Sequence, residues 1–236
     1  MAKLEWDKTG ERFYETGTTK GVLYPQDDKG TYPKGVVWNG LTAITESPSG
    51  AEPTDLYADD IKYATLRSAE TFGATIEAYT YPEEFAECDG SVMPVKGVYL
   101  GQQARKTFGM CYRTKVSSDA NEDLGYKLHL LYGCTASPSE KAYSTINDSP
   151  EAITFSWEIT TVPANVEGYK ATALITIDST KVEPEKMEML EKVLYGTEEK
   201  EAMLPLPNDV IKIITEGTYE GYSLGKGIPV ATKGNL

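Results

Sequence analysis

The sequence predicts a mainly β fold, a β-sandwich or barrel with one or two flanking helices. Apolar and polar residues alternate with a period of two in segment after segment, which is the pattern of half-buried strands. Gly and Pro residues separate these segments and mark the turns between them. Helical signals are confined to two stretches, near residues 82–88 and 184–195. About nine strands and two helices, without an internal repeat, indicate a sheet protein decorated by helices.

The chain of 236 residues is long enough for one large β domain or two smaller ones. Residues 10–37 are rich in Gly and Pro, so we expect small hairpins or an ordered arm over residues 1–35. We expect the main β-sandwich domain over residues 36–216. Residues 217–236 are Gly-rich and predict a C-terminal tail.

The first elements of the main domain are a strand and a loop. Residues 36–46 alternate as a strand in which Gly40 favours a bulge. Residues 47–60 contain two Pro and one Gly and show no periodicity, so we expect a long loop. Loops longer than about 12 residues are uncommon in compact domains and are usually functional or disordered. The segment is therefore a candidate site.

A hairpin and a short helix follow this loop. Residues 61–66 and 72–78 alternate as two strands and predict a hairpin closed by residues 68–71. Pro82 then opens a short helix with acidic residues near its start, and Asp89-Gly90 ends it. We expect a polar connection over residues 90–101.

The second half predicts two strand pairs, a helix and a last strand. Residues 107–116 should pair with 126–132 across a polar turn, and residues 153–160 should pair with 171–177. Pro184 begins an amphipathic helix that Gly196 ends. We expect the last strand over residues 210–215.

No side-chain pattern that carries enzyme chemistry is complete, so we expect no catalytic residue, metal or cofactor. The only histidine, His129, lies in an alternating strand and is expected to be structural or exposed. Asp119, Asn121 and Asp123 have calcium-loop spacing without the required Gly and Glu, which favours a hairpin turn. Residues 221–227 lack the spacing and the helix of a phosphate loop. The three cysteines form no CxxC motif and are expected to be free and buried.

The net charge of −13 argues against ordinary nucleic-acid binding, which needs a basic footprint. An acidic surface keeps a protein soluble, and it also suits a conduit through which DNA passes without sticking. Charge alone does not choose between these roles. No apolar run approaches the ~20 residues needed to span a bilayer, and the first residues lack a signal-peptide core, so we expect a cytoplasmic protein.

Residues 56–90, LYADDIKYATLRSAETFGATIEAYTYPEEFAECDG, join the predicted hairpin to the acidic helical turn. In this form the segment resembles the major tail proteins of long-tailed, siphophage-type bacteriophages, the subunits that polymerise into the tail tube. The spacing of strands and helices extends the resemblance, less specifically, to about residue 216. The resemblance implies β-sandwich subunits that assemble six to a ring, and stacked rings whose inner sheets form one barrel around the DNA channel.

The resemblance also implies partners and a location. The partners are the protein itself, a tape measure protein, a tail terminator and distal tail or baseplate proteins. DNA would pass through the lumen without specific binding, and no membrane insertion is expected. The location would be the virion tail, made and assembled in the bacterial host cytoplasm.

In the family, a long loop between two early strands reaches a neighbouring subunit or ring. The matching segment here lies within residues 47–60, and its candidate contact residues are Ser47, Pro48, Gly50, Glu52, Asp55, Leu56, Tyr57, Asp59 and Asp60. Candidates for the lumen wall are polar residues on or beside strands whose other face is apolar: Glu77, Thr154, Ser156 and Glu158. An outer solvated face gives the same pattern.

Two alternatives stay open. One is the tube protein of a phage-tail-like bacteriocin or contractile system. The other is a carbohydrate-binding or adhesin β-sandwich, in which Trp38 or Trp157 would supply stacking platforms. Packing in the core or at an interface is the simpler role for both rings.

Overall fold

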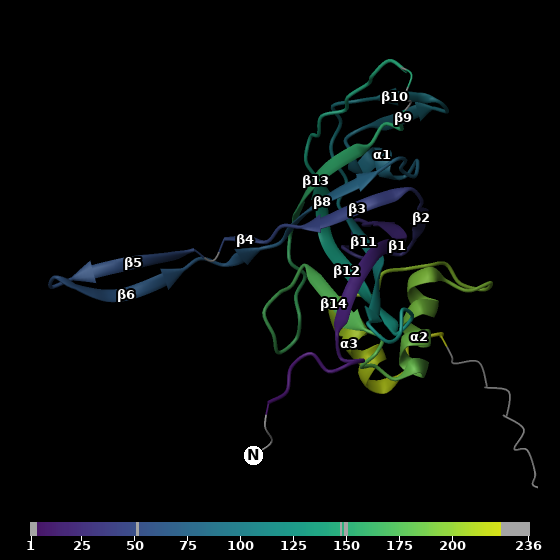
Figure 1. Ribbon diagram of the computed structural model, residues 1–236. Helices are drawn as coiled ribbons and strands as arrows, with labels where there is room; N and C mark the ends of the chain where they lie inside the picture. The colour runs from purple at the N-terminus through teal and green to yellow at the C-terminus, as the bar shows by residue number, and fades with distance from the viewer. Residues whose placement is uncertain (1–3, 51, 147, 149–150, 223–236) are drawn as a thin grey trace, which may run out of the picture.

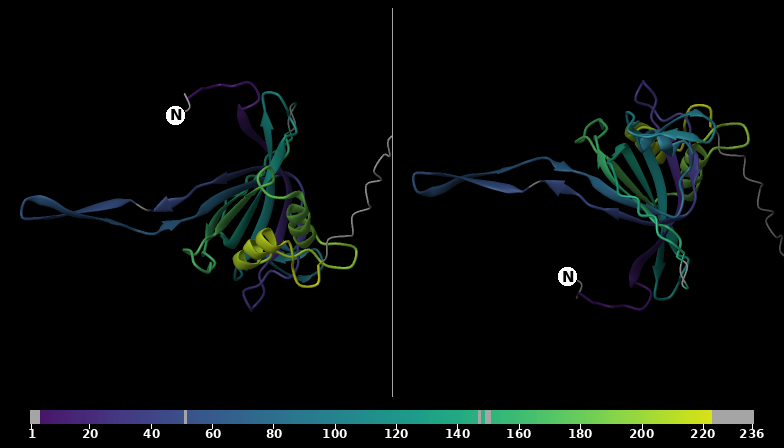
Figure 2. Two further views of the ribbon diagram at one scale, coloured as in Figure 1. Left: turned by 90° about the horizontal axis from the view of Figure 1, so that it is seen from below. Right: turned by 90° about the horizontal axis from the view of Figure 1, so that it is seen from above.

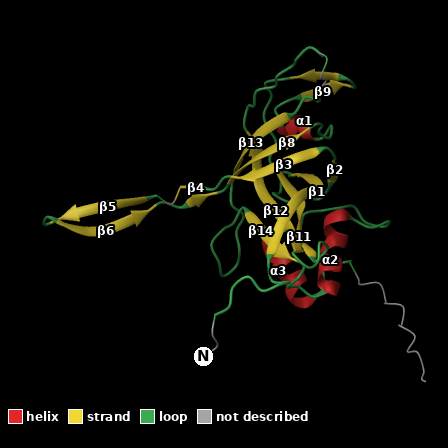
Figure 3. Ribbon diagram, in the orientation of Figure 1, coloured by secondary structure: helices red, strands yellow, loops and turns green. Residues whose placement is uncertain are grey.

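The computed structural model describes residues 4–50, 52–146, 148 and 151–222 (Figure 1). Of the described residues, 43% are in strands and 12% in helices, which confirms the predicted mainly β fold (Figure 3). One large antiparallel sheet forms the body, three helices pack on it, and two hairpins extend from it.

The body sheet has eight strands in the order β2-β1-β11-β12-β13-β8-β3, with β14 paired to β12. β14 pairs with the first half of β12 and β13 with its end, so the two strands share one neighbour. The outermost strands, β2 and β3, are consecutive in the chain, and the sheet therefore curls back on itself (Figure 2). The bounds are β1 Phe13–Pro25, β2 Val36–Trp38, β3 Leu41–Glu46, β8 Gly73–Ala78, β11 Phe108–Ser118, β12 Gly125–Ala136, β13 Phe155–Thr161 and β14 Leu174–Asp178.

The concave face of the sheet encloses an aromatic core. The rings of Trp38, Phe85 and Trp157 meet with centroids 4.5 to 5.7 Å apart, and all three are buried. Phe85 comes from the short helix α1 (Phe85–Cys88), which confirms the helical turn predicted after Pro82. Burial of such large rings contributes several kcal/mol to the free energy of folding.

Helices α2 (Pro184–Tyr195) and α3 (Pro207–Glu216) cover the other face of β1, β11 and β12 (Figures 1 and 3). Tyr24 of β1 donates a hydrogen bond to the carbonyl of Leu194, 2.6 Å away, and Tyr132 of β12 donates to Pro205 at 2.9 Å. These buried phenols fix the helices on the sheet, because breaking either bond leaves a polar group unsatisfied. Helix α2 has the predicted start and end.

The strand pairing confirms one predicted pair and contradicts two. β11 and β12 pair as expected. Residues 61–66 pair with residues 53–58 rather than with 72–78, and β13 pairs with β12 and β8 rather than with β14. Alternation tells which residues share a face, whereas the packing of the whole sheet selects the partner strand.

Three further expectations are corrected. The strand over 36–46 is divided at Gly40, whose φ of 75° turns the chain from β2 to β3. Residues 13–25 form β1, which lies in the body sheet between β2 and β11, so this part of the region expected as hairpins or an arm belongs to the main domain. Residues 210–215 belong to helix α3, because Pro207 and Gly217 provide helix start and stop signals and Val210 and Ile213 bury one helical face. Of the predicted tail, residues 223–236 lie outside the described residues.

Candidate interaction surfaces

A long two-stranded hairpin leaves the body between β3 and β8 (Figures 1 and 2). We call residues 47–72 the arm. In it β4 (Ser49–Gly50) pairs with β7 (Glu70–Thr71), and β5 (Pro53–Ala58) pairs with β6 (Ile61–Arg67). Between residues 49 and 71, every described residue except half-buried Ala64 is exposed. The prediction of a loop over residues 47–60 is therefore wrong. These residues form the outgoing half of the arm, with strands β4 and β5, and the turn at its tip.

The outer part of the arm is amphipathic. Asp55 lies on the polar face, where it binds the Lys62 ammonium at 2.7 Å and accepts a 2.7 Å hydrogen bond from Thr65. The strand register places Leu56, Ile61 and Leu66 on the opposite face, where they are 42%, 63% and 57% exposed. An isolated two-stranded hairpin is marginally stable, and an exposed apolar face of this kind is typical of interaction surfaces.

The tip of the arm is an acidic turn. Asp59 and Asp60 have φ values of 52° and 62°, the left-handed conformation that both central residues of a type I′ turn require. Asp tolerates this conformation better than most residues. The predicted contact residues are therefore spread along the whole arm. Ser47 and Pro48 lie at its root, whereas Asp59 and Asp60 place two adjacent carboxylates at its tip.

The root of the arm is fixed to the body. Ser47 N donates to Gly73 O at 2.8 Å, and Thr161 of β13 donates to Phe72 O at 2.6 Å. Further out, the hydroxyls of Ser49 and Thr71 share a 2.9 Å hydrogen bond. The direction in which the arm leaves the sheet is thus set by hydrogen bonds on both of its strands.

A polar cluster lies beside this root. Tyr112 donates a 2.6 Å hydrogen bond to Glu46 Oε1, at the end of β3, and its ring stacks on His129 with centroids 4.6 Å apart. The Nε2 atom of His129 is 3.0 Å from Thr114 Oγ1, and Nδ1 is 3.3 Å from Glu46 without hydrogen-bond alignment. Burial lowers the pKa of His129, although Glu46 opposes the shift, and burial raises the pKa of Tyr112. Of the two settings predicted for His129, structural or exposed, the structure shows the buried one.

The lumen candidates lie along the outer face of two neighbouring strands. Glu77 of β8 is the register partner of Ser156 of β13, and Glu158 follows two residues later opposite Thr75. Trp157 and Ile159 point to the core between them. Thr154 precedes β13 and is exposed. The structure brings three of the four candidates together on one solvated polar face, and their lumen position stays a prediction.

A second exposed hairpin replaces the polar connection expected over residues 90–101. β9 (Val92–Val95) pairs with β10 (Val98–Leu100), and Lys96-Gly97 forms the tip. Its apolar side chains are more than a third exposed: Val92, Met93, Val95, Val98, Tyr99 and Leu100. The base of the hairpin is held to α1, because Ser91 N donates to Ala86 O at 2.8 Å. Valines on both sides of Lys-Gly are the sequence signal for this hairpin.

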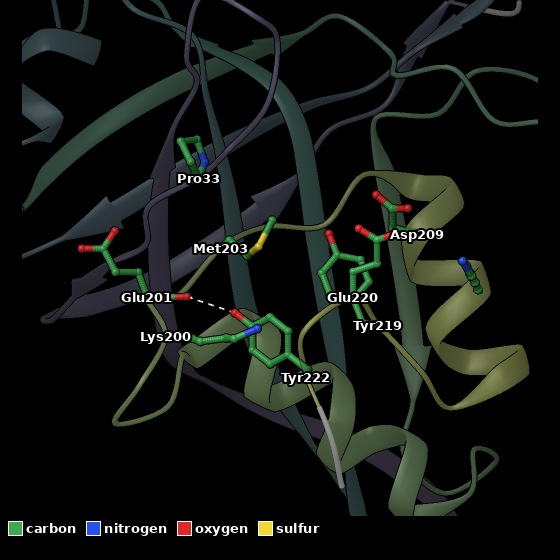
Figure 4. A pocket seen from close by; sticks show the side chains of 9 residues that line it. Pro33, Lys200, Glu201, Met203, Asp209, Tyr219, Glu220 and Tyr222 are labelled. Carbon is green, nitrogen blue, oxygen red and sulfur yellow. Dashed lines mark hydrogen bonds between the residues drawn. The ribbon is translucent and has the colours of Figure 1, made fainter.

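The remaining features favour structural roles. A hollow beside α3 is lined by side chains of both charge signs, and Lys200 lies over the Tyr222 ring there at 4.3 Å (Figure 4). The Tyr222 hydroxyl donates to Glu201 O in the same hollow. Within the described residues, no group of three His, Cys, Asp or Glu is placed to hold a metal. No described helix is long and apolar enough to cross a bilayer.

The other motif residues behave as the patterns predict. Asn121 accepts a hydrogen bond from Asp123 N and so stabilises the turn between β11 and β12. Asp119 accepts one from Gly10 N and so ties this turn to the segment that precedes β1. The three cysteines are buried and free.

Trp38 and Trp157 are 2% and 0% exposed, which removes the stacking platforms that a carbohydrate-binding role would use.

Comparison with known proteins yields only weak structural likenesses. No family model and no curated protein matches the chain. Among solved structures, the chain is similar to one in the sheath–tube complex of PVC, an extracellular contractile injection system, in its extended state. The two share 13% identity and a TM-score of 0.30 over 74% of this chain and 94% of that one. Values this low do not assign the chain to a family.

Proposed function

We propose that this protein is the structural subunit of a phage tail tube or of a related tube, and that it polymerises through its arm. The observation that carries the proposal is the arm itself: a 2-stranded hairpin with an apolar face exposed to solvent. A monomer gains little from ordering such a hairpin, whereas a polymer buries it against a neighbour. The resemblance of residues 56–90 to tail tube proteins supports the same role.

The edges of the body sheet support polymerisation as well. Within the described part of the chain, the outer edges of β2, β3 and β14 have no paired strand. Free edges invite pairing with other chains, and a closed assembly satisfies their backbone groups. In the proposed tube, six subunits form a ring and stacked rings continue the sheets around a channel.

The proposed channel carries DNA during ejection. The polar face with Glu77, Ser156 and Glu158 is a suitable wall, because carboxylates repel phosphates and leave no binding sites for them. The net charge of −13 agrees with such a wall. The tape measure, terminator and distal tail or baseplate proteins would then be partners at the lumen and the two tube ends.

Removal of the arm tests the proposal. Ser47 N is hydrogen-bonded to Gly73 O, so replacing residues 49–71 by Asn-Gly closes β3 and β8 with a two-residue hairpin turn. The shortened chain should fold with an unchanged melting temperature and remain monomeric. The full chain should form rings and tubes when concentrated, as seen by sedimentation and electron microscopy. Tubes of normal length from the shortened chain would refute the role of the arm.

A further inference from the structure

The hairpin of β9 and β10 has the surface of a docking site. Val95, Val98 and Leu100 are 66%, 50% and 50% exposed, so at least half of each side chain faces solvent. The hairpin is nevertheless held firmly at its base, where Gln103 N donates to Gly90 O at 2.9 Å. Because the hairpin is held in place and its apolar surface is exposed, we expect a partner to cover this surface.

The charge of this region is opposite to that of the arm. Residues 90–106 contain three basic residues and no acidic one: Lys96, Arg105 and Lys106. Arg105 and Lys106 form salt bridges to Asp89 and Glu87, while Lys96 at the tip forms none in the described structure. Residues 52–70 of the arm contain five acidic and two basic residues. Complementary charge steers such surfaces together and fixes their register.

The positions of the two hairpins require separate copies of the chain. Figure 1 shows the arm leaving one side of the body and β9–β10 at another end. The arm extends about 40 Å from root to tip, at roughly 3.3 Å per strand residue. A compact body of this size is also about 40 Å across. An arm can therefore cross one neighbouring body, and each copy gives one arm and receives another, which makes a head-to-tail contact.

We propose that the arm of one copy docks on the β9–β10 hairpin of the next. The apolar face with Leu56 and Ile61 covers Val95 and Val98, and the acidic turn of Asp59 and Asp60 lies beside Lys96. The proposal rests on the proposed self-association and identifies the surface that receives the arm. Apolar burial supplies the affinity, and the tip charges set the register.

Crosslinking tests the contact directly. A full chain with Ala58→Cys and Val95→Cys should give a ladder of multimers with a short bis-maleimide, because each copy carries both halves of a head-to-tail contact. Thr54→Cys with Val95→Cys is the matched control, since residue 54 lies four residues back on the same strand face and should give no ladder. The three native thiols should stay unreactive, because all are buried and burial raises the pKa of each, to about 12 for Cys88 and Cys111.

The outcomes separate the alternatives. Dimers from Ala58→Cys alone would show that arms pair with arms, and would overturn the proposal. Tubes that assemble normally but give no ladder would overturn the docking surface and leave the proposed function standing. A chain that remains monomeric at all concentrations would overturn both.

Charge exchange provides a second measurement. Asp60→Lys and Lys96→Glu should each raise the concentration at half assembly roughly three- to tenfold, and the two together should restore it to within about twofold. Asp60→Asn keeps a residue that tolerates the left-handed turn, so it separates charge from strain. Lys170→Glu, an exposed residue outside both hairpins, is the control for net charge. Additive effects of the two reversals would refute a direct contact.

Discussion

Replacing the apolar face of the arm should weaken assembly without destabilising the monomer. The variant carries Leu56→Ser, Ile61→Ser and Leu66→Ser. Their exposed fractions of 42%, 63% and 57% correspond to about one and a half fully exposed side chains. At about 2 kcal/mol for each buried apolar side chain, covering them contributes about 3 kcal/mol per arm. The concentration at half assembly should therefore rise about a hundredfold.

Sedimentation across a concentration series measures this shift, and a thermal melt of the monomer measures stability. The melting temperature should change little, because surface substitutions outside packed contacts usually alter stability by less than about 0.5 kcal/mol. The matched control replaces Ile146, Val162 and Tyr169 by Ser, since these residues are at least as exposed but lie outside both hairpins. Equal assembly of the two variants would refute the reasoning, as would a melting temperature that falls only in the arm variant.

Three further predictions concern the body. Glu46→Ala should leave the buried Tyr112 hydroxyl without its acceptor, cost about 2 kcal/mol and lower the melting temperature by several degrees, whereas Glu46→Gln should retain most of the stability. Burial, together with the Lys127 charge, lowers the pKa of His129 below 6.5 against the opposing charges of Glu46 and Glu15, so the unfolded chain is protonated first. Folding stability should therefore fall as the pH drops below about 6.5, and His129→Phe should flatten that dependence in melts from pH 7 to pH 5. In the proposed tube, Glu77→Lys or Glu158→Lys should permit assembly but reduce infectivity per particle, because one added cation in each of the six proposed subunits of a ring would attract DNA phosphates. Glu183→Lys at the N-cap of α2 is the control outside this face, and normal infectivity of both lumen variants would contradict the lumen assignment.

The sequence predicted well wherever local chemistry decides the structure. Helix α2 begins at Pro184 and is followed by Gly196, and β11 and β12 pair across the turn that contains Asn121, because these residues act on their own neighbours in the chain. Partner choice between distant strands was not readable in this way. The pairing of β13 with both β8 and β12 follows from the curl of the whole sheet around Trp157.

The arm was located by the sequence but its structure was not predicted. Residues 53–58 show little alternation of polar and apolar residues, because neither face of this strand packs on the body. The sequence predicts a strand in place of helix α3, because the β-branched residues around Ile213 have a high strand propensity. The helix forms because Pro207 and Gly217 favour its start and end and because Val210 and Ile213 bury one helical face. The β9–β10 hairpin carried a readable Lys-Gly turn signal.

Hydrogen exchange of the arm, compared between monomer and assembled protein, tests the central claim most directly. In the monomer, the amides of residues 52–67 should exchange quickly, because a solvated two-stranded hairpin opens easily. In the assembled protein the same amides should be strongly protected, while those of β11 and β12 in the core should be slow in both states. Equally fast exchange of the arm in both states would contradict the account, because it would show that assembly leaves the arm uncovered.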